Sequence, residues 1–556
     1  VDPTCPLNEY PRPLAERARW KNLNGLWNYS IVPAGTPAGA YDGQILVPFA
    51  VESSLSGVGK RLGAENELWY ARTFVVPTDW NGDRILLHFG AVDWKADVWV
   101  NDVQVGSHTG GYAPFTFDVT AALHKKGENT LKVRVWDPTE RGEQPRGKQT
   151  SAPGGIWYTP VSGIWQTVWL EPVPQRYIAG LRTTPDIDRR TLRIEADVPD
   201  AEPNDRIEVT VMDGERTVAT AVALPGVAAE AAMPADMKLW SPDSPFLYDL
   251  RVTLKSGKET VDEVKSYAAM RKFSTARDAD GIVRLQLNNR DLFMFGPLDQ
   301  GWWPDGLYTA PTDEALEYDV IKTKQWGFNM IRKHVKVEPA RWYTHCDRHG
   351  IIVWQDMPSS TGGPQWQMEQ YFDGAEWPES EADFRKEWQE IMDYLYSNPC
   401  IGVWVPFNEA WGQFETAEIA QWTKTHDPTR LVNPASGGNH YPCGDMLDLH
   451  HYPDPEMYLY DAKRATVLGE YGGIGMAAEG HLWEPDRNWG YVQFKTPAEV
   501  TEAYLRYTGM LLDMIPRGFS AGVYTQTSDV EIEVNGLMTY DRKKIKIDET
   551  KVREIN

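Results

Sequence analysis

Two glutamates stand where apolar runs of the sequence end. Glu409 follows the run 401–407 and Asn408, and Glu470 follows the run 466–468 and Gly469. A buried strand rarely ends in a glutamate without a reason, because burying an unpaired charge is costly. One carboxyl group that donates a proton and a second that attacks carbon or activates water suit the cleavage of a glycosidic bond. We therefore expect Glu409 and Glu470 to face one another; the alternative is two solvated loop glutamates.

The ends of other apolar runs also carry polar or aromatic side chains. An arginine beside a carboxylate would hold it ionised, and a tyrosine hydroxyl could hydrogen-bond it. The candidates are Asp299, Trp302, Trp303, Arg332, His334, Asp356, His450, His451 and Tyr452. The alternatives are an internal salt bridge for Arg332 and a hydrogen-bonded core position for His450. Neighbouring strand residues point to opposite faces, so one of the two adjacent histidines should point away, and we expect no metal site.

From about residue 277 onward, strand-like runs alternate with helix-like ones. Eight apolar runs occur within about 280 residues, the usual size of a (β/α)8 barrel, in which the chemistry lies at the carboxyl ends of the strands. The runs are 293–295, 329–331, 351–354, 401–407, 431–433, 446–449, 466–468 and 521–524. Thr312, followed by Asp313 and Glu314, predicts the start of one helix. Two more helices are predicted at about 338–348 and 380–397.

The first half of the chain predicts β-structure instead. Short alternating runs separated by turn residues, such as 84–89 and 130–136, favour a β-sandwich. A shorter block with runs such as 206–211 follows and fits an immunoglobulin-like sandwich of about 100 residues. We thus predict a multidomain protein with domains at 1–172, 173–276 and 277–556.

Composition limits the classes of function. The 556 residues can bury a large core without disulfides or metal ions. A net charge of −23 argues against nucleic acid and anionic membranes as partners. The sequence has no run of 18 apolar residues for a membrane-spanning helix, and its four cysteines form no CxxC pair for zinc. We expect no cofactor, and the oligomeric state stays open.

Two further features bear on the substrate and the compartment. The chain contains 24 Trp and 25 Tyr, whose rings pack well on the apolar faces of sugars, although large sandwich cores use tryptophan too. The sequence begins Val1-Asp2-Pro3, which a removed signal peptide or trimming of the chain would explain. We expect a periplasmic or secreted protein.

Motifs across nearly the whole chain resemble glycoside hydrolase family 2, the group of β-galactosidases, β-glucuronidases and β-mannosidases. Segments 23–27, 69–74, 108–115 and 163–170 match the family's sugar-binding-like jelly-roll domain, and 239–248 its immunoglobulin-like domain. Asn408-Glu409 matches the acid/base motif, and Glu470 matches the nucleophile. The resemblance implies a jelly-roll β-sandwich, an immunoglobulin-like β-sandwich and a catalytic (β/α)8 TIM barrel.

The resemblance also implies roles within a retaining double displacement. Glu409 would protonate the glycosidic oxygen and later activate water, and Glu470 would form the glycosyl-enzyme ester. Asn408 would hydrogen-bond the sugar 2-hydroxyl. Further substrate-binding or positioning candidates are Arg332, His334, Tyr452, Trp411, Asp299, Trp302, Asp356 and Tyr524.

Three departures from the family pattern affect the substrate. Family β-glucuronidases grip the sugar carboxylate with an Asn-x-Lys motif, where this chain has Glu533-Val534-Asn535. Glu533 would repel a uronate, so glucuronide cleavage is disfavoured unless Arg332, Lys333 or Lys336 supplies the positive charge. The family's Arg-x-x-His is one residue shorter here, and Tyr524-Thr525-Gln526 stands where many members place a tryptophan.

We therefore predict a β-galactosidase-like exo-enzyme that acts on a glycoside or oligosaccharide. The alternatives are a mannoside, arabinoside or uronide specificity, a transglycosylating enzyme, and a catalytically inactive glycan-binding protein.

Overall fold

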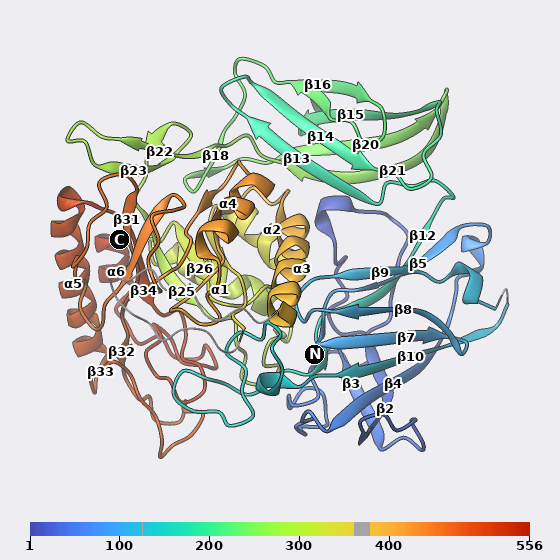
Figure 1. Ribbon diagram of the computed structural model, residues 1–556, viewed down its shortest axis with the longest axis horizontal. Coiled ribbons are helices and arrows are strands. Elements are labelled where there is room, and N and C mark those ends of the chain that lie inside the picture. The colour runs from blue at the N-terminus through green and yellow to red at the C-terminus, as the bar shows by residue number, and fades with distance from the viewer. Residues whose placement is uncertain (125, 361–377) are drawn as a thin grey trace.

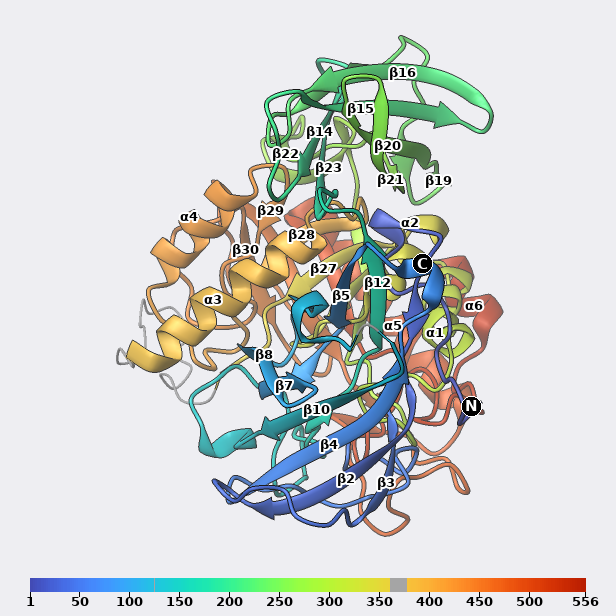
Figure 2. The ribbon, with the colours of Figure 1, turned by 90° about the vertical axis from the view of Figure 1, so that its right-hand side faces the viewer.

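The computed structural model describes residues 1–124, 126–360 and 378–556, and they form three bodies (Figure 1). A first β-sandwich lies beside a barrel, and a second sandwich, residues 180–268, stands at one end of the molecule in both views (Figure 2). None of the helices in these ranges has the length and apolar character needed to cross a bilayer.

The N-terminal sandwich contains a six-stranded sheet of order β3-β2-β4-β10-β7-β8 and a four-stranded sheet of order β1-β12-β5-β9. Its strands are β1 (Lys21–Asn22), β2 (Gly25–Pro33), β3 (Gly43–Val47), β4 (Asn66–Val75), β5 (Arg84–Phe89), β6 (Val92–Asp93), β7 (Lys95–Val100), β8 (Val103–Thr109), β9 (Phe115–Asp118), β10 (Glu128–Trp136), β11 (Gly163–Ile164) and β12 (Val168–Val173). In β10, Leu131, Val133 and Val135 are buried and their neighbours are not, as the predicted alternation requires. The predicted sandwich is confirmed.

The second sandwich is built from a three-stranded sheet, β13-β14-β17, and a four-stranded sheet, β16-β15-β20-β21. Its strands and those of the connection to the barrel are β13 (Gly180–Asp186), β14 (Thr191–Asp197), β15 (Asp205–Asp213), β16 (Arg216–Ala223), β17 (Ala229–Ala232), β18 (Trp240–Ser241), β19 (Ser244–Pro245), β20 (Tyr248–Ser256), β21 (Glu259–Ala268), β22 (Phe273–Arg277), β23 (Val283–Leu287) and β24 (Arg290–Asp291). Ile194, Val209 and Val252 are among the side chains of its separate core.

Eight parallel strands form a nearly closed barrel of order β29-β28-β27-β26-β25-β34-β31-β30. They are β25 (Met294–Asp299), β26 (Met330–Lys333), β27 (Ile352–Asp356), β28 (Ile401–Val405), β29 (Leu431–Val432), β30 (Met446–His450), β31 (Ala465–Gly472) and β34 (Phe519–Thr525). Each of the eight predicted runs overlaps one of these strands, so the predicted barrel is confirmed. The short strands β32 (Ile474–Gly475) and β33 (Val492–Gln493) pair outside it.

Helices cover the outside of the barrel. They are α1 (Asp313–Gln325), α2 (Ala340–His349), α3 (Pro378–Leu395), α4 (Thr416–His426), α5 (Pro497–Met514) and α6 (Glu549–Ile555). The side chain of Thr312 accepts a hydrogen bond from the backbone N–H of Ala315 at 3.1 Å, which is the predicted cap of α1. The other two predicted helices are α2 and α3.

One loop of the N-terminal sandwich, residues 142–162, lies against the barrel. The backbone N–H of Gly147 donates to the carbonyl of Ser359 at 3.0 Å, and that of Thr159 donates to the carboxylate of Glu531 at 2.8 Å. The hydroxyl of Tyr158 hydrogen-bonds Glu533. This loop, which we call the sandwich loop, therefore adds side chains of the first domain to the barrel surface.

Most of the tryptophan signal belongs to packing. Eight of the 24 tryptophans are among the largest fully buried side chains, and Trp354 and Trp404 lie on barrel strands. Large cores therefore account for much of the tryptophan content, which was the alternative to carbohydrate binding.

Candidate active site

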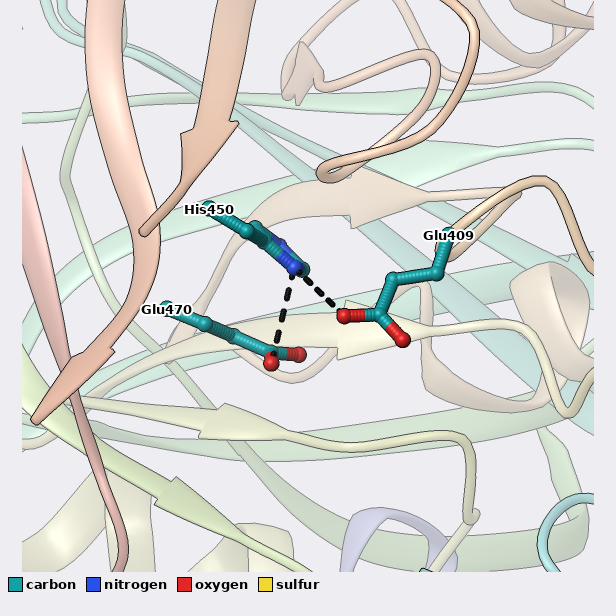
Figure 3. A group of neighbouring side chains, drawn as sticks. All are labelled: Glu409, His450 and Glu470. Atoms are coloured by element: carbon teal, nitrogen blue, oxygen red, sulfur yellow. Dashed lines mark hydrogen bonds and ion pairs between the residues drawn. The ribbon is translucent and has the colours of Figure 1, made fainter. Parts of the chain in front are cut away.

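Glu409 and Glu470 approach one another beside His450. Figure 3 shows both carboxyl groups directed toward the imidazole. His450 Nδ1 lies 2.9 Å from Glu409 Oε1 and 3.5 Å from Glu470 Oε2. One oxygen of each carboxyl group and one nitrogen of the imidazole all lie within 4.8 Å of one another. The structure thus brings together the two glutamates that the sequence singled out.

The two glutamates differ in backbone and exposure. Glu470 lies within β31 and 5% of its side chain is exposed, whereas Glu409 follows β28 and 27% of its side chain is exposed. Glu409 and Ala410 have φ angles of 48° and 65°, which non-glycine residues adopt infrequently. The backbone N–H of Glu409 donates to the carbonyl of Ser436 at 2.9 Å and anchors this turn. Glu409 is therefore the carboxyl group that reaches toward solvent.

Arg332 connects the buried acids of the site. Its guanidinium lies 3.2 Å from Glu470 Oε1 and 2.9 Å from Asp356 Oδ2, and it donates to Asn408 Oδ1 at 2.6 Å. The hydroxyl of Tyr452 donates to Glu470 Oε2 at 2.6 Å. Each oxygen of Glu470 thus accepts a hydrogen bond, and the two bonds fix the orientation of this carboxylate.

The charges around Glu409 set its protonation. Burial opposes its ionisation, but the hydrogen bond and positive charge of His450 outweigh burial and lower the pKa of Glu409. Burial also opposes a charged His450, yet the negative charges of Glu470 and Glu409 raise the pKa of that imidazole. In this arrangement the proton of the pair therefore resides on His450.

Asp356 and His334 form a second pair within the site. His334 Nδ1 lies 3.0 Å from Asp356 Oδ2 and 4.0 Å from Glu470 Oε1, so the shortened Arg-x-His spacing still brings this histidine to the carboxylates. Burial lowers the pKa of His334 far below its usual value and keeps the ring neutral. Burial raises the pKa of Asp356 to about 6, although the positive charge of Arg332 opposes this rise.

The remaining predicted residues divide into two groups. The ring of Trp411 lies 6.5 Å from that of His334, between centroids, and so belongs to the site. Asp299 is instead paired with Lys333 at 2.9 Å, and Trp302 packs on Tyr158 and Tyr308 behind the sandwich loop.

Tyr524 is not brought to the carboxylates, which corrects its placement among the site residues. It packs against Tyr504 of α5 and Tyr471, in the layer between barrel and helices. Its neighbour Thr525 instead contacts the hydroxyl of Tyr452 at 2.7 Å. Because strand residues alternate between faces, residue 525 rather than 524 faces the site.

Sequence reasoning missed the side chains that the sandwich loop supplies. The ring of Trp157 lies 5.0 Å from that of Trp411, and Lys148 Nζ lies 5.9 Å from the same ring. Nothing in the sequence pattern indicates which loop of another domain reaches the barrel mouth, so the sequence carries no signal for Trp157 and Lys148. Tyr491 of the barrel domain, which sequence reasoning also missed, stacks on Tyr452 with 3.6 Å between ring centroids.

Within the described part of the chain, Glu409, His450 and Glu470 have the spacing of a metal-binding group. A metal ligand must be a neutral imidazole, however, and the raised pKa of His450 favours the protonated ring. His451 points elsewhere, toward Glu456 at 2.8 Å, as strand alternation predicts. The chemistry of these groups therefore fits a shared proton better than a cation.

The three basic residues considered for a uronide are all neutralised. Arg332 holds Asp356 and Glu470, and Lys333 lies 2.9 Å from Asp299. Lys336 lies 2.6 Å from Glu338. None of them has a free charge to offer a sugar.

Three family models match most of the chain. Residues 58–161 match the glycosyl hydrolase 2 galactose-binding domain-like model, 176–271 the glycosyl hydrolases family 2 model, and 285–554 the family's TIM barrel domain. A putative β-glucuronidase of Formosa agariphila is 27% identical over 384 residues, which cover 66% of this chain and 34% of that protein. A β-galactosidase of Priestia megaterium is 24% identical over 482 residues, which cover 79% of this chain and 45% of that protein.

The chain thus spans between a third and half of the length of these curated relatives. Among solved structures, the β-D-glucuronidase of Dictyoglomus thermophilum superposes with a TM-score of 0.76 at 17% identity and covers 98% of both chains, which shows a shared fold. Because the three family models together account for most of the sequence, the chain belongs to glycosyl hydrolase family 2.

Proposed function

We propose that the protein removes terminal β-linked sugars by a retaining double displacement, with Glu470 as nucleophile and Glu409 as acid/base. The observation that carries this proposal is the spacing of the pair. Their nearest carboxylate oxygens lie within 4.8 Å. Retaining enzymes hold the two carboxyl groups about 5–5.5 Å apart, and inverting enzymes leave about 6.5–9.5 Å for a water molecule.

The contacts of Glu470 support its role as nucleophile. Attack on the anomeric carbon forms an ester bond from a carboxylate oxygen while the glycosidic C–O bond breaks and the leaving oxygen takes a proton. Arg332 and Tyr452 each donate to one oxygen of the attacking carboxylate and fix its direction. Water then cleaves the ester, and the proton it loses returns to Glu409.

Glu409 must hold a proton when the glycosidic bond breaks. In the substrate-free arrangement that proton resides on His450, 2.9 Å from Glu409 Oε1. The short contact lets the proton pass to Glu409 as a substrate oxygen approaches, and the exposure of Glu409 leaves it open to the leaving group.

Asn408 has a free donor for the substrate. Its Oδ1 accepts from Arg332, so its side-chain amide is oriented, while its buried Nδ2 has no hydrogen-bond partner among the described residues. Buried donors are rarely left unpaired. A hydroxyl group of the bound sugar would pair this one, in line with the expected contact to the 2-hydroxyl.

A panel of chromogenic galactosides, glucuronides, mannosides, arabinosides and fucosides tests the proposal. We expect turnover of at least one of them, and Glu470→Gln should lower that turnover by about 10⁴-fold or more, because removing a nucleophile leaves only binding and polar stabilisation. Unchanged turnover in this variant would contradict the assignment.

Three further outcomes of the panel separate the alternatives. Retention predicts that the first sugar released has the β configuration by NMR. Transfer to an added alcohol in preference to water would identify a transglycosylating enzyme. Binding of sugars without turnover of any glycoside would identify a glycan-binding protein. Galactoside cleavage remains the prediction from the sequence. Uronide cleavage is the second candidate, because the buried ammonium of Lys148 lies near the ring of Trp411.

A further inference from the structure

Lys148 of the sandwich loop is a buried cation without an acidic partner. The residue is 5% exposed, and its Nζ lies 5.7 Å from the ring centroid of Tyr158 and 5.9 Å from that of Trp411. Among the described residues, no carboxylate lies within 4.0 Å of this ammonium, and none of them hydrogen-bonds it. Arg332 and Lys333, by contrast, each form a salt bridge with an aspartate.

A buried ammonium is costly unless it is paired. Two aromatic rings stabilise a cation at such distances, but they leave its charge without a counterion. The position of Lys148 therefore favours a negative charge that arrives from outside the chain.

Lys148 stands close enough to the reacting groups to contact their substrate. The ring of Trp411 lies near both Lys148 and His334. Burial lowers the pKa of His334, and the charge of Lys148 lowers it further. Burial raises the pKa of Glu409, but His450 and then Lys148 act against it and lower this pKa. The ammonium therefore acts on the same space as the carboxylate pair.

Glu533 is the acid that could compete for Lys148. It is already held by the hydroxyl of Tyr158 and by Asn535 Nδ2 at 3.0 Å. Burial raises the pKa of Glu533, and the charge of Lys148 opposes that rise. The two hydrogen bonds hold Glu533 more than 4.0 Å from the ammonium of Lys148.

We propose that Lys148 determines specificity by binding an anionic group, a carboxylate or a sulfate ester, on the sugar that the Glu409–Glu470 pair cleaves. This inference rests on the proposed function. It supplies from another domain the charge that residues 533–535 lack, and the rings of Trp157 and Trp411 offer apolar faces beside it.

The test compares substrates that differ in one charge. Each anionic 4-nitrophenyl β-D-glycoside is compared with its neutral counterpart: the glucuronide with the glucoside, and the galacturonide and the galactoside 6-sulfate with the galactoside. Wild type should cleave the anionic member of at least one of these pairs better than the neutral member. Lys148→Met, which keeps the length without the charge, should lower kcat/KM for the anionic member by about 100-fold, since a charged hydrogen bond is typically worth about 1.5–3 kcal/mol. The neutral member should change by only a few-fold. The carboxylate and sulfate arms identify which anion is the substrate.

Two variants serve as controls. Lys148→Arg should retain part of the anionic preference, and Lys60→Met, which removes an exposed lysine of the same domain, should leave it unchanged. Equal losses on charged and neutral substrates, or a wild type that prefers the neutral sugars, would overturn the inference.

A binding measurement separates this inference from the proposed function. Calorimetry of glucuronic acid, galacturonic acid and galactose 6-sulfate against the Glu470→Gln protein requires no turnover. Tighter binding of an acid than of its neutral counterpart, lost in the double variant with Lys148→Met, supports Lys148 even if no glycoside is cleaved. Equal binding of acid and neutral sugar contradicts it.

Discussion

Two groups of buried acids in this protein differ in whether a cation lies beside them. In the barrel mouth, Arg332 lies between Asp356 and Glu470 and compensates their charge. The other group lies at the contact between the N-terminal sandwich and α3 and contains Glu52, Asp93, Asp137 and Glu387. No lysine or arginine of the described chain lies within 4.0 Å of any of these four.

The uncompensated acids all have raised pKa values. Burial raises the pKa of Glu52 and of Glu387 to about 8 and that of Asp137 to about 6, and it raises the pKa of Asp93 well above its usual value. Hydrogen bonds replace the missing cations, for example from Gln149 Nε2 to Asp93 Oδ2 at 2.8 Å. The comparison shows that an arginine lies beside the acids of the barrel mouth, whereas hydrogen bonds take its place in the second group.

The largest effect is expected from breaking the compensated group. Arg332→Met leaves Glu470 and Asp356 buried without a cation, so we expect a loss of about 3–5 kcal/mol in the free energy of unfolding. Activity should fall as well, because Glu470 would lose the guanidinium that donates to its Oε1 and orients it. Denaturant unfolding followed by tryptophan fluorescence, together with the glycoside panel, measures both.

Arg332→Lys is the matched control for this variant. It keeps the charge but not the paired geometry that reaches Asp356, Glu470 and Asn408 together. We expect it to recover most of the stability and little of the activity. A methionine variant as stable as wild type would show that compensation by Arg332 is unimportant.

A smaller effect is expected from the uncompensated group. The ordinary pKa of Glu387 is 4.5 and its folded value is about 8, so the folded protein keeps a proton that the unfolded chain loses. The free energy of unfolding therefore falls as the pH rises from 4.5 to about 8. Glu387→Gln keeps an oxygen for the backbone N–H of Tyr112, 2.9 Å from Glu387 Oε1, and removes this dependence.

We expect Glu387→Gln to raise stability by about 1–2 kcal/mol at pH 8 and by less at pH 5. Melting temperatures across this range measure the difference. Glu479→Gln, an exposed glutamate on the barrel side, is the control and should leave the pH dependence unchanged. A parallel shift of the Glu387→Gln curve at every pH would contradict the explanation.

The barrel mouth also shows which features could be predicted from the sequence. The barrel strands were predictable because each is a continuous apolar run, and Glu409, Glu470, Arg332 and Tyr452 could be found because they follow such runs. Local pattern and the known geometry of the fold were enough to place them.

Other features depend on contacts between distant parts of the chain. Lys148 lies in a loop of a different domain, and its partner rings are about 10 to 260 positions away in the sequence. Glu387 is buried only because α3 packs on the segment around Tyr112. Tyr524 was misplaced by a single position, since an apolar run shows where a strand lies but not which of its residues face inward.

The smallest expected effect concerns the proton shared by Glu409 and His450. It tests whether the charge of Glu409 is compensated by this one neighbour. His450→Gln removes the charge that lowers the pKa of Glu409, so burial should then dominate and raise it. Because the proposed acid role requires a protonated Glu409, the alkaline limb of the kcat/KM profile should move up by about one pH unit. His451→Gln is the matched control, since the adjacent ring points toward Glu456. If the limb stayed in place or moved to lower pH, the charges of Arg332 and Lys148 would be the main cause of the low pKa of Glu409. The charge of Glu409 would then be compensated by the whole cluster of cations in the barrel mouth and not by its contact with His450 alone.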